Sequence, residues 1–356
     1  MEKEFVAIIA TTIAVTILVL LVKCIYKRSN KLVVAQNLES PIINGLYKFT
    51  ITEIENALNM GKINMRRRKW LGNGKRGEFY QGILPSGQVV AIKDMYKTKD
   101  AMDSFITEVE CLSRARHPII VCLLGFCNED GNQFLVYEHC SAGNLAQYLL
   151  REDTLLTWDA RVKILRDCAC AIKYLHHYID GCIIHRDIKL SSILLSETLE
   201  PRLCGFGQSK MLGMDKSEVF EDVLESGMYK DPEYKKSGLL TCAIDIYSFG
   251  VVMLQVLSGT KIACFDEHDT HILLKKAKDV STGKLPITEF EDPRLKGKRM
   301  NHEVLQSILQ TAVVCVAETR KGRPTIEQVL EELNKACRLS NISWPCNVPP
   351  VRNYSN

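Results

Sequence analysis

The sequence predicts an α+β fold that follows an N-terminal membrane-spanning helix. Three observations lead to this prediction. A glycine-rich stretch is followed by the apolar strand 88–93, where a dinucleotide-binding fold would have a long helix. Phe105, Val109 and Leu112 then recur at the spacing of one helix face. An uncharged apolar run, residues 5–22, precedes both features.

The run 5–22 is long enough to cross a bilayer. As a helix it would measure about 27 Å, close to the ~30 Å hydrocarbon core. The alternative is a cleaved signal peptide, which needs a basic start and a small-residue cleavage site. This chain starts with Met1-Glu2-Lys3-Glu4, and Lys23 directly follows the run. A retained anchor in the lipid bilayer is therefore the favoured interpretation.

Positive charge after the anchor predicts its orientation. Lys23, Lys27, Arg28 and Lys31 lie just beyond the run, and such residues stay on the cytoplasmic side. Residues 1–4 would then be extracytosolic and the bulk of the chain cytosolic, in a single-pass protein of the plasma membrane. Cys24 at the membrane edge is either a palmitoylation site or an ordinary cysteine.

Composition excludes some classes of protein. A formal net charge of +4 over 356 residues is too small for nucleic-acid binding by electrostatics alone. The 14 cysteines are scattered and include no CxxC pair with metal spacing, which favours free thiols in a reducing compartment.

The composition also divides the chain. Residues 23–65 are predicted to be a juxtamembrane linker, with helical spacing at Ile51, Ile54 and Leu58. The basic run 66–69 is a solvated face, a strand entry or a lipid contact. Residues 66–337 form the folded domain, and the Ser-, Asn- and Pro-rich tail 338–356 is predicted to be disordered.

Several motifs within the domain point to one chemistry. Glycines at 72, 74 and 77 fit a phosphate-binding loop, and a hairpin around residues 85–87 leads to a strand that ends in Lys93. Glu108 lies on the amphipathic helix, fifteen residues after Lys93, and is either a partner of Lys93 or a surface carboxylate. His185-Arg186-Asp187 follows two isoleucines further along.

In this order and at these spacings the motifs resemble those of the protein kinase superfamily. The amino-acid sequences of segments 231–234 and 247–252 are most similar to those of the plant receptor-like kinases and their interleukin-1-receptor-associated (Pelle-like) relatives. The resemblance implies a bilobal fold. Its small β-rich lobe, 66–137, would carry one main helix, and its larger lobe, 141–337, would be mainly helical.

The resemblance also implies a site. Asp187 would orient the substrate hydroxyl, Lys189 would steady the γ-phosphate as in serine/threonine kinases, and Lys93 paired with Glu108 would hold the α- and β-phosphates. The residues implied to bind ATP are Leu71, Gly72, Gly74, Gly77, Phe79, Ala91, Lys93, Glu138, Cys140 and Leu194.

The resemblance further implies three structural features. Asp245 would anchor the catalytic loop, and Arg323 would pair with Glu233 in the large lobe. Phe206 would join Leu112 and His185 in an internal column.

The chain departs from the family at three positions. Gly205 stands where kinases carry the Asp that binds Mg²⁺, and Ser192 replaces the second ligand, an Asn. Phe79 replaces a Val over the adenine, where it would either fill the site or stack on the base. Magnesium binding is therefore expected to be weak or absent, while ATP binding remains possible through Lys93 and the glycine-loop amides.

Losing about 4–6 kcal/mol of metal stabilisation would slow phosphoryl transfer roughly 10³- to 10⁴-fold. The chain is thus predicted to be a pseudokinase that acts as a scaffold or allosteric partner of active receptor kinases and other signalling proteins. The alternatives are a slow serine/threonine kinase with unusual metal dependence and a nucleotide sensor. A further hypothesis pairs an acidic residue between 207 and 231 with Arg186, in place of a phosphate.

Overall fold

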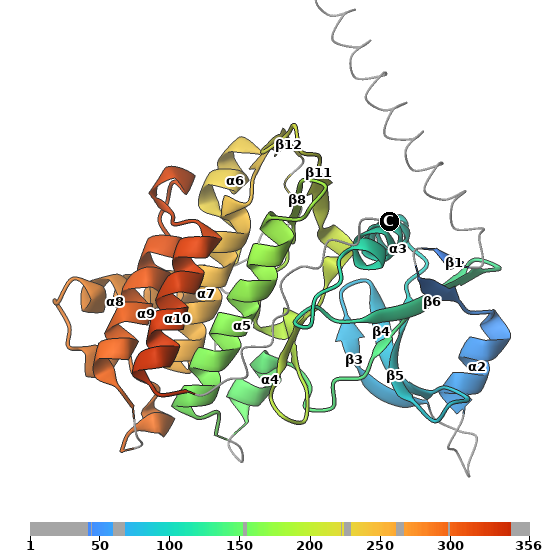
Figure 1. Ribbon diagram of the computed structural model, residues 1–356, viewed down its shortest axis with the longest axis horizontal. Coiled ribbons are helices and arrows are strands. Elements are labelled where there is room, and N and C mark those ends of the chain that lie inside the picture. The colour runs from blue at the N-terminus through green and yellow to red at the C-terminus, as the bar shows by residue number, and fades with distance from the viewer. Residues whose placement is uncertain are drawn as a thin grey trace, which may run out of the picture.

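The computed structural model describes residues 42–43, 45–59, 68–151, 155–221, 223, 229–260, 267–297 and 300–342. The predicted anchor 5–22, Cys24 and most of the predicted tail 338–356 lie outside these ranges. Among the described helices, none is both long and apolar enough to cross a bilayer. The described residues form two lobes, one built around a sheet and one mainly of helices (Figure 1).

The small lobe is a seven-stranded sheet in the order β1-β2-β6-β7-β5-β4-β3. Every neighbouring pair is antiparallel except β2 and β6, which run parallel. The strands are β1 (Ile42–Ile43), β2 (Leu46–Lys48), β3 (Lys69–Gly74), β4 (Gly77–Ile83), β5 (Val89–Met95), β6 (Leu123–Glu129) and β7 (Asn132–Glu138).

The elements β1, β2 and α2 (Ile51–Asn59), all upstream of residue 66, belong physically to this lobe. Strand β2 pairs with β6, and helix α2 packs on the sheet beside it (Figure 1). Ile54 and Leu58 of α2 are buried against Val90 and Ile92 of β5. The helical spacing predicted for the linker 23–65 is therefore present, and it buries an apolar face on the small lobe.

Helix α3 (Lys99–Arg114) is the main helix of the small lobe. Thr98 caps its N-terminus by accepting a hydrogen bond from the amide of Ala101 at 3.2 Å. Its apolar stripe, with Phe105 and Val109, is buried in the main core. The same helix packs against the 3₁₀ turn η2 (Phe206–Gln208) of the large lobe, so it joins the two lobes.

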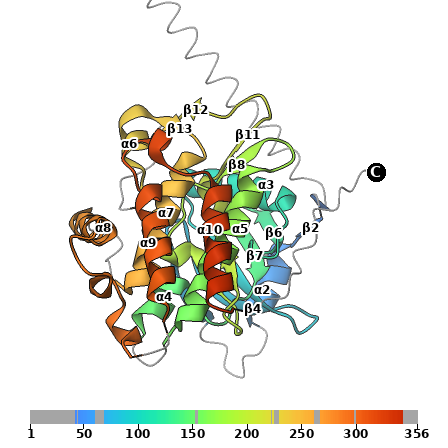
Figure 2. The ribbon, with the colours of Figure 1, turned by 60° about the vertical axis from the view of Figure 1, so that its left-hand side comes forward.

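The large lobe is a helical bundle with short strand pairs at the side that faces the small lobe (Figures 1 and 2). Helix α5 packs on α10, and α7 packs on α9. The helices are α4 (Leu145–Leu150), α5 (Trp158–His176), α6 (Pro232–Ser237), α7 (Ala243–Ser258), α8 (Glu267–Ser281), α9 (His302–Cys315) and α10 (Ile326–Leu339). The short strands are β8 (Cys182–Ile184), β9 (Ile193–Leu195), β10 (Pro201–Leu203), β11 (Lys210–Leu212), β12 (Val219–Phe220) and β13 (Leu239–Leu240).

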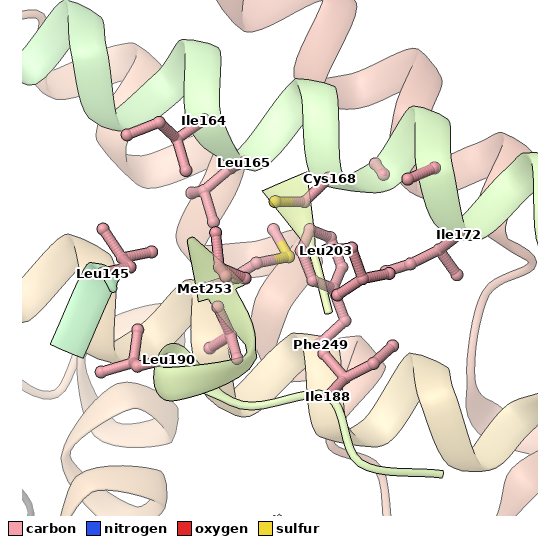
Figure 3. Packing of buried hydrophobic residues seen from close by; sticks show 14 of the residues in the cluster. Leu145, Ile164, Leu165, Cys168, Ile172, Ile188, Leu190, Leu203, Phe249 and Met253 are labelled. Atoms are coloured by element: carbon pink, nitrogen blue, oxygen red, sulfur yellow. The ribbon is translucent and has the colours of Figure 1, made fainter. Parts of the chain in front are cut away.

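Helix α7 is apolar on all sides and is buried from Ile244 to Leu257. Figure 3 shows Phe249 and Met253 of α7 packed near Cys168 and Ile172 of α5, with Ile188 of the loop after β8 beside Phe249. This packing fixes residues 185–192 above the core of the large lobe.

A buried ion pair ties the bottom of this lobe together. Arg161 of α5 is fully buried, and its Nη2 lies 2.6 Å from Oδ2 of Asp292. The guanidinium also donates to the carbonyls of Val256 and Leu156, at 2.7 and 2.9 Å. One carboxylate and two carbonyl oxygens therefore compensate the buried guanidinium charge of Arg161, as burial of an arginine requires.

We predict that Asp292→Ala lowers the free energy of unfolding by about 3–5 kcal/mol, because Arg161 would be left as an unpaired buried charge. Urea denaturation followed by circular dichroism measures this loss. Lys335→Ala, which removes an exposed ion pair to Glu332, is the matched control and should leave the midpoint unchanged. Equal midpoints for both variants would contradict the role assigned to Arg161.

Candidate functional site

The glycine-rich stretch forms the tight connection between β3 and β4. Gly77 pairs with Gly74 across the turn, and a Cβ on Gly77 would collide with the carbonyl oxygen of Asp94 on β5. Only glycine fits at that point. A Cβ on Gly74 would lie 2.8 Å from the ring of Phe79, so this ring lies against the loop.

Phe79 lies among the residues implied to bind nucleotide. The ammonium of Lys93 is 5.7 Å from the centroid of its ring, within the range of a cation–π contact. The centroid of the Phe79 ring lies 6.5 Å from that of Tyr137, which is buried at the end of β7. The Phe79 ring therefore contacts both the glycine loop and the ammonium of Lys93.

The ion pair expected between Lys93 and Glu108 is present. Nζ of Lys93, on β5, lies 2.9 Å from Oε2 of Glu108, on α3, and both side chains are more than 90% buried. The pair fixes α3 against the sheet, and α3 in turn holds η2. A charged group at this depth is stable only with such a partner.

The other residues implied to bind ATP lie on both sides of the junction between the lobes. Leu71 lies at an irregularity of β3, and Ala91 on β5 faces Tyr137 across the sheet. The Glu138 carboxylate accepts a hydrogen bond from the amide of Cys122 at 2.7 Å. From the large lobe, Leu194 on β9 packs with Phe79 and Ala91 on the main core, and Cys140 follows β7.

Asp245 anchors the catalytic loop, as the sequence predicts. It is fully buried at the start of α7 and accepts hydrogen bonds from the amides of His185 (2.8 Å) and Arg186 (2.9 Å) and from Nε2 of His176 (3.0 Å). Burial alone would raise its pKa, but these bonds and the nearby histidines bring it below the usual value. The anchor is therefore a carboxylate at neutral pH.

The loop itself is held in a strained conformation. Arg186 has a φ of +68°, unusual for a residue with a side chain. His185 stacks edge-on against Phe206, with ring centroids 4.6 Å apart, and its Nε2 lies 3.0 Å from the carbonyl oxygen of Cys204. Phe206 and Leu112 belong to the same buried cluster. The predicted internal column is thus packed on the loop.

Asp187 and Lys189 form a pair within this loop. Nζ of Lys189 lies 2.8 and 2.9 Å from the two carboxylate oxygens of Asp187. Both side chains are partly exposed. The two residues implied to act on the substrate hydroxyl and the γ-phosphate are therefore brought together.

The residues at the two metal-ligand positions do not fit Mg²⁺. Gly205 has no ligand, and its Cβ position would lie 3.8 Å from Oδ2 of Asp187. The Ser192 hydroxyl is buried; it donates to the carbonyl of Lys189 at 2.8 Å and accepts from its amide at 2.9 Å. Within the ranges given above, no three His, Cys, Asp or Glu side chains are placed to hold a metal ion.

Positive charge from lysines lies near Asp187. Nζ of Lys230 donates to the carbonyl of Arg186 at 2.9 Å, next to Asp187. Burial lowers the pKa of Lys230 to about 8; the charge of Asp187 opposes this shift, and Arg186 and Lys189 add to it. Desolvation also lowers the pKa of Lys75, at the tip of the glycine loop, where the charge of Asp187 acts in the opposite direction.

Sequence reasoning missed Lys230 as a member of the site. It was visible only as the residue before the segment Asp231-Pro232-Glu233. The positive charge of Lys230 directly before Asp231 was the signal available in the sequence.

The hypothesis that an acidic residue pairs with Arg186 has a structural counterpart in Glu221. Its Oε2 lies 3.8 Å from Nη1 of Arg186, and its Oε1 lies 2.5 Å from Nζ of Lys210 on β11. Arg186 also donates to the hydroxyl of Tyr234 at 3.0 Å. A carboxylate thus joins two cations from the catalytic loop and β11, in the manner expected of a bound phosphate.

One predicted pair is wrong. Arg323 does not bind Glu233; its Nη2 donates to Oδ1 of Asp231 at 2.7 Å. Asp231 also caps α6 by accepting from the amide of Glu233 at 2.8 Å, which turns its carboxylate toward the buried arginine. Glu233 instead accepts from the amide of Arg320.

We predict that Glu221→Gln loosens the segment after β11, because the neutral amide loses its attraction to Arg186 and Lys210. Limited trypsin digestion should cut this segment roughly threefold to tenfold faster. Asp215→Asn makes the same change of charge in the same segment and serves as the control. If the two variants are cleaved at the same rate, the ordering role of Glu221 is wrong.

Comparison with known proteins supports the resemblance to protein kinases. The protein kinase domain family matches residues 65–333. A probable receptor-like protein kinase of Arabidopsis thaliana is 35% identical over 289 residues, which are 80% of this chain and 59% of the relative. Wall-associated receptor kinase 4 of the same plant is 38% identical over 268 residues, 74% of this chain and 36% of the relative. The chain thus spans between about a third and three fifths of these relatives. It belongs to the protein kinase domain family.

Proposed function

We propose that this chain is a receptor-like pseudokinase: a protein kinase homologue that binds nucleotide, transfers no phosphate, and acts as a binding module for active kinases. The observation that carries the proposal is the pair of changed ligand positions. Gly205 offers no side-chain oxygen, and the hydroxyl of Ser192 is hydrogen-bonded to the backbone of Lys189. Phosphoryl transfer depends on metal ions that neutralise the phosphates, so their loss removes the largest electrostatic term.

The proposal includes ATP as a ligand. A protein kinase domain is a fold that binds ATP, and the Lys93–Glu108 pair supports such a role here. Lys75, Lys189 and Lys230 supply positive charge around Asp187. We propose that this charge receives the triphosphate with little or no help from magnesium. Phe79 would restrict how deeply the base enters.

The intact anchoring of the catalytic loop supports selection for shape. Asp245, the His185–Phe206 contact and the Glu221 bridge all hold an ordered surface without requiring catalysis. Active receptor kinases and other signalling proteins are the proposed partners, and residues 5–22 the proposed membrane anchor at the plasma membrane.

A second candidate function is a slow serine/threonine kinase. The observation that favours it is the contact between Asp187 and Lys189, together with the Lys93–Glu108 pair. These four side chains would suffice to position a hydroxyl and a phosphate. Both candidate functions use the same fold. They differ in whether phosphate is transferred, because the side chains at the two metal-ligand positions are changed.

The double variant Gly205→Asp, Ser192→Asn tests whether only the metal ligands were lost. Residue 205 has a φ of +88°, a conformation that Asp tolerates better than most residues, and nothing lies closer than 3.8 Å to its Cβ position. We expect phosphate incorporation into a basic protein substrate to rise at least about 100-fold over the unchanged chain, with Mg²⁺ present.

The triple variant that adds Asp187→Asn should remain inactive, which controls for contaminating kinase. If neither the unchanged chain nor the double variant transfers phosphate although the double variant binds ATP, the loss of activity has another cause. Measurable turnover by the unchanged chain that the double variant only equals, and that Asp187→Asn abolishes, would favour the second candidate.

Lys230 makes metal-free ATP binding dependent on pH. Because its pKa is about 8, its ammonium is charged at pH 7 and becomes neutral as the pH rises. The phosphates of ATP are already ionised in this range. We therefore expect ATP affinity in EDTA to fall roughly threefold to tenfold between about pH 7 and about pH 9.5, measured by calorimetry.

Lys230→Arg is the matched control, because a guanidinium stays charged throughout this range. It should keep its affinity at high pH. Identical pH profiles for the variant and the unchanged chain would remove Lys230 from the phosphate site.

A further inference from the structure

A second hollow lies apart from the nucleotide site. A cavity of about 760 Å³ is lined by the end of α5, residues 213–218 and the start of α7. None of the residues implied to bind ATP lines it. Two cysteines, Cys182 and Cys242, do. The proposed function uses neither of them.

The two cysteines lie on segments that the fold already holds together. Cys182 is the first residue of β8, and Cys242 directly precedes α7. Both pack against the same small apolar cluster, which contains Ile184, Leu240 and Ile244. Three residues beyond each cysteine, the amide of His185 donates to Asp245 at 2.8 Å. The backbone around both thiols is therefore fixed.

The thiols also contact each other. Cys242 donates a hydrogen bond to the sulfur of Cys182, which lowers the pKa of the Cys182 thiol and raises that of Cys242. Burial and the charge of Asp245 act against ionisation of both. Two thiols on neighbouring segments, one to react with an oxidant and one to resolve the product, are the components of a redox-active pair.

We propose that Cys182 and Cys242 form a reversible disulfide when a hydroperoxide enters this cavity. The proposal rests on their common cavity, their shared apolar cluster and the hydrogen bond between His185 and Asp245 that fixes the adjoining backbone. It does not depend on whether the domain transfers phosphate.

The chemistry balances with one equivalent of hydrogen peroxide. The Cys182 thiolate attacks one oxygen of the peroxide, forming a sulfenic acid, and hydroxide leaves and takes up a proton to become water. The sulfur of Cys242 then attacks the sulfenic sulfur, its proton leaves with the hydroxyl group, and a second water is released. Two thiols and one peroxide give one disulfide and two waters. A dithiol reductant reverses the bond by exchange.

The bond would join β8 to α7 directly beneath the catalytic loop. It would close a loop that contains Asp187, Gly205 and Glu221, and so both the catalytic loop and the segment after β11. Cross-linking removes conformational freedom from such a loop in the unfolded chain. An oxidised chain is therefore expected to melt about 5 °C higher than the reduced chain.

The test uses the full chain in mild detergent, reduced first and then treated with hydrogen peroxide. Remaining thiols are blocked and the protein is digested with trypsin. Cleavage after basic residues gives the peptides 174–186 and 237–261, each with a single cysteine, Cys182 or Cys242. We expect these two peptides to be linked in most molecules, and to separate after dithiothreitol.

Cys182→Ser and Cys242→Ser should each abolish the link, whereas Cys170→Ser, on α5, should leave it intact. Phenylarsine oxide, which bridges adjacent thiols, should protect the pair from oxidation in the unchanged chain. The proposal is overturned if peptides 174–186 and 237–261 stay unlinked, or if peroxide converts Cys182 to sulfinic acid while Cys242 remains a free thiol.

Discussion

The two carboxylate oxygens of Asp245 accept three hydrogen bonds in the interior of the large lobe. Two of these bonds fix the backbone of His185 and Arg186, and the bond to Arg186 holds a residue with positive φ. Once that backbone is fixed, the side chains of the catalytic loop have defined places. Asp187 forms an ion pair with Lys189, and Arg186 forms one with Glu221. The ring of His185 packs edge-on against that of Phe206. The conformation of the catalytic loop therefore depends on one buried carboxylate at the start of α7.

Charge is redistributed around this scaffold. In a protein kinase, metal ions offset the phosphates; here one ligand position is a glycine and the hydroxyl at the other is used within the loop. Lysines from the glycine loop, the catalytic loop and the segment before α6 bring positive charge near Asp187. Positive charge at this point favours the binding of anionic groups.

Local patterns predicted part of this structure well. The resemblance to protein kinases paired Lys93 with Glu108, and the two side chains form that ion pair. The spacing of Ile54 and Leu58 showed a helix, yet a periodic pattern does not say which surface covers it. The partner of Arg323 was misassigned because two carboxylates two residues apart point differently once one of them caps α6. The approach of Lys230 to Asp187, and of Cys182 to Cys242, joins segments far apart in sequence, and no local signal reports it.

We propose that the kinase fold persists in this chain while phosphoryl transfer is lost. The most direct measurement is the intact mass of the full chain after incubation with ATP and either Mg²⁺ or Mn²⁺, beside an Asp187→Asn variant. The account predicts no phosphate on either protein. Phosphate on the unchanged chain that disappears with Asp187→Asn would contradict it and establish an enzyme.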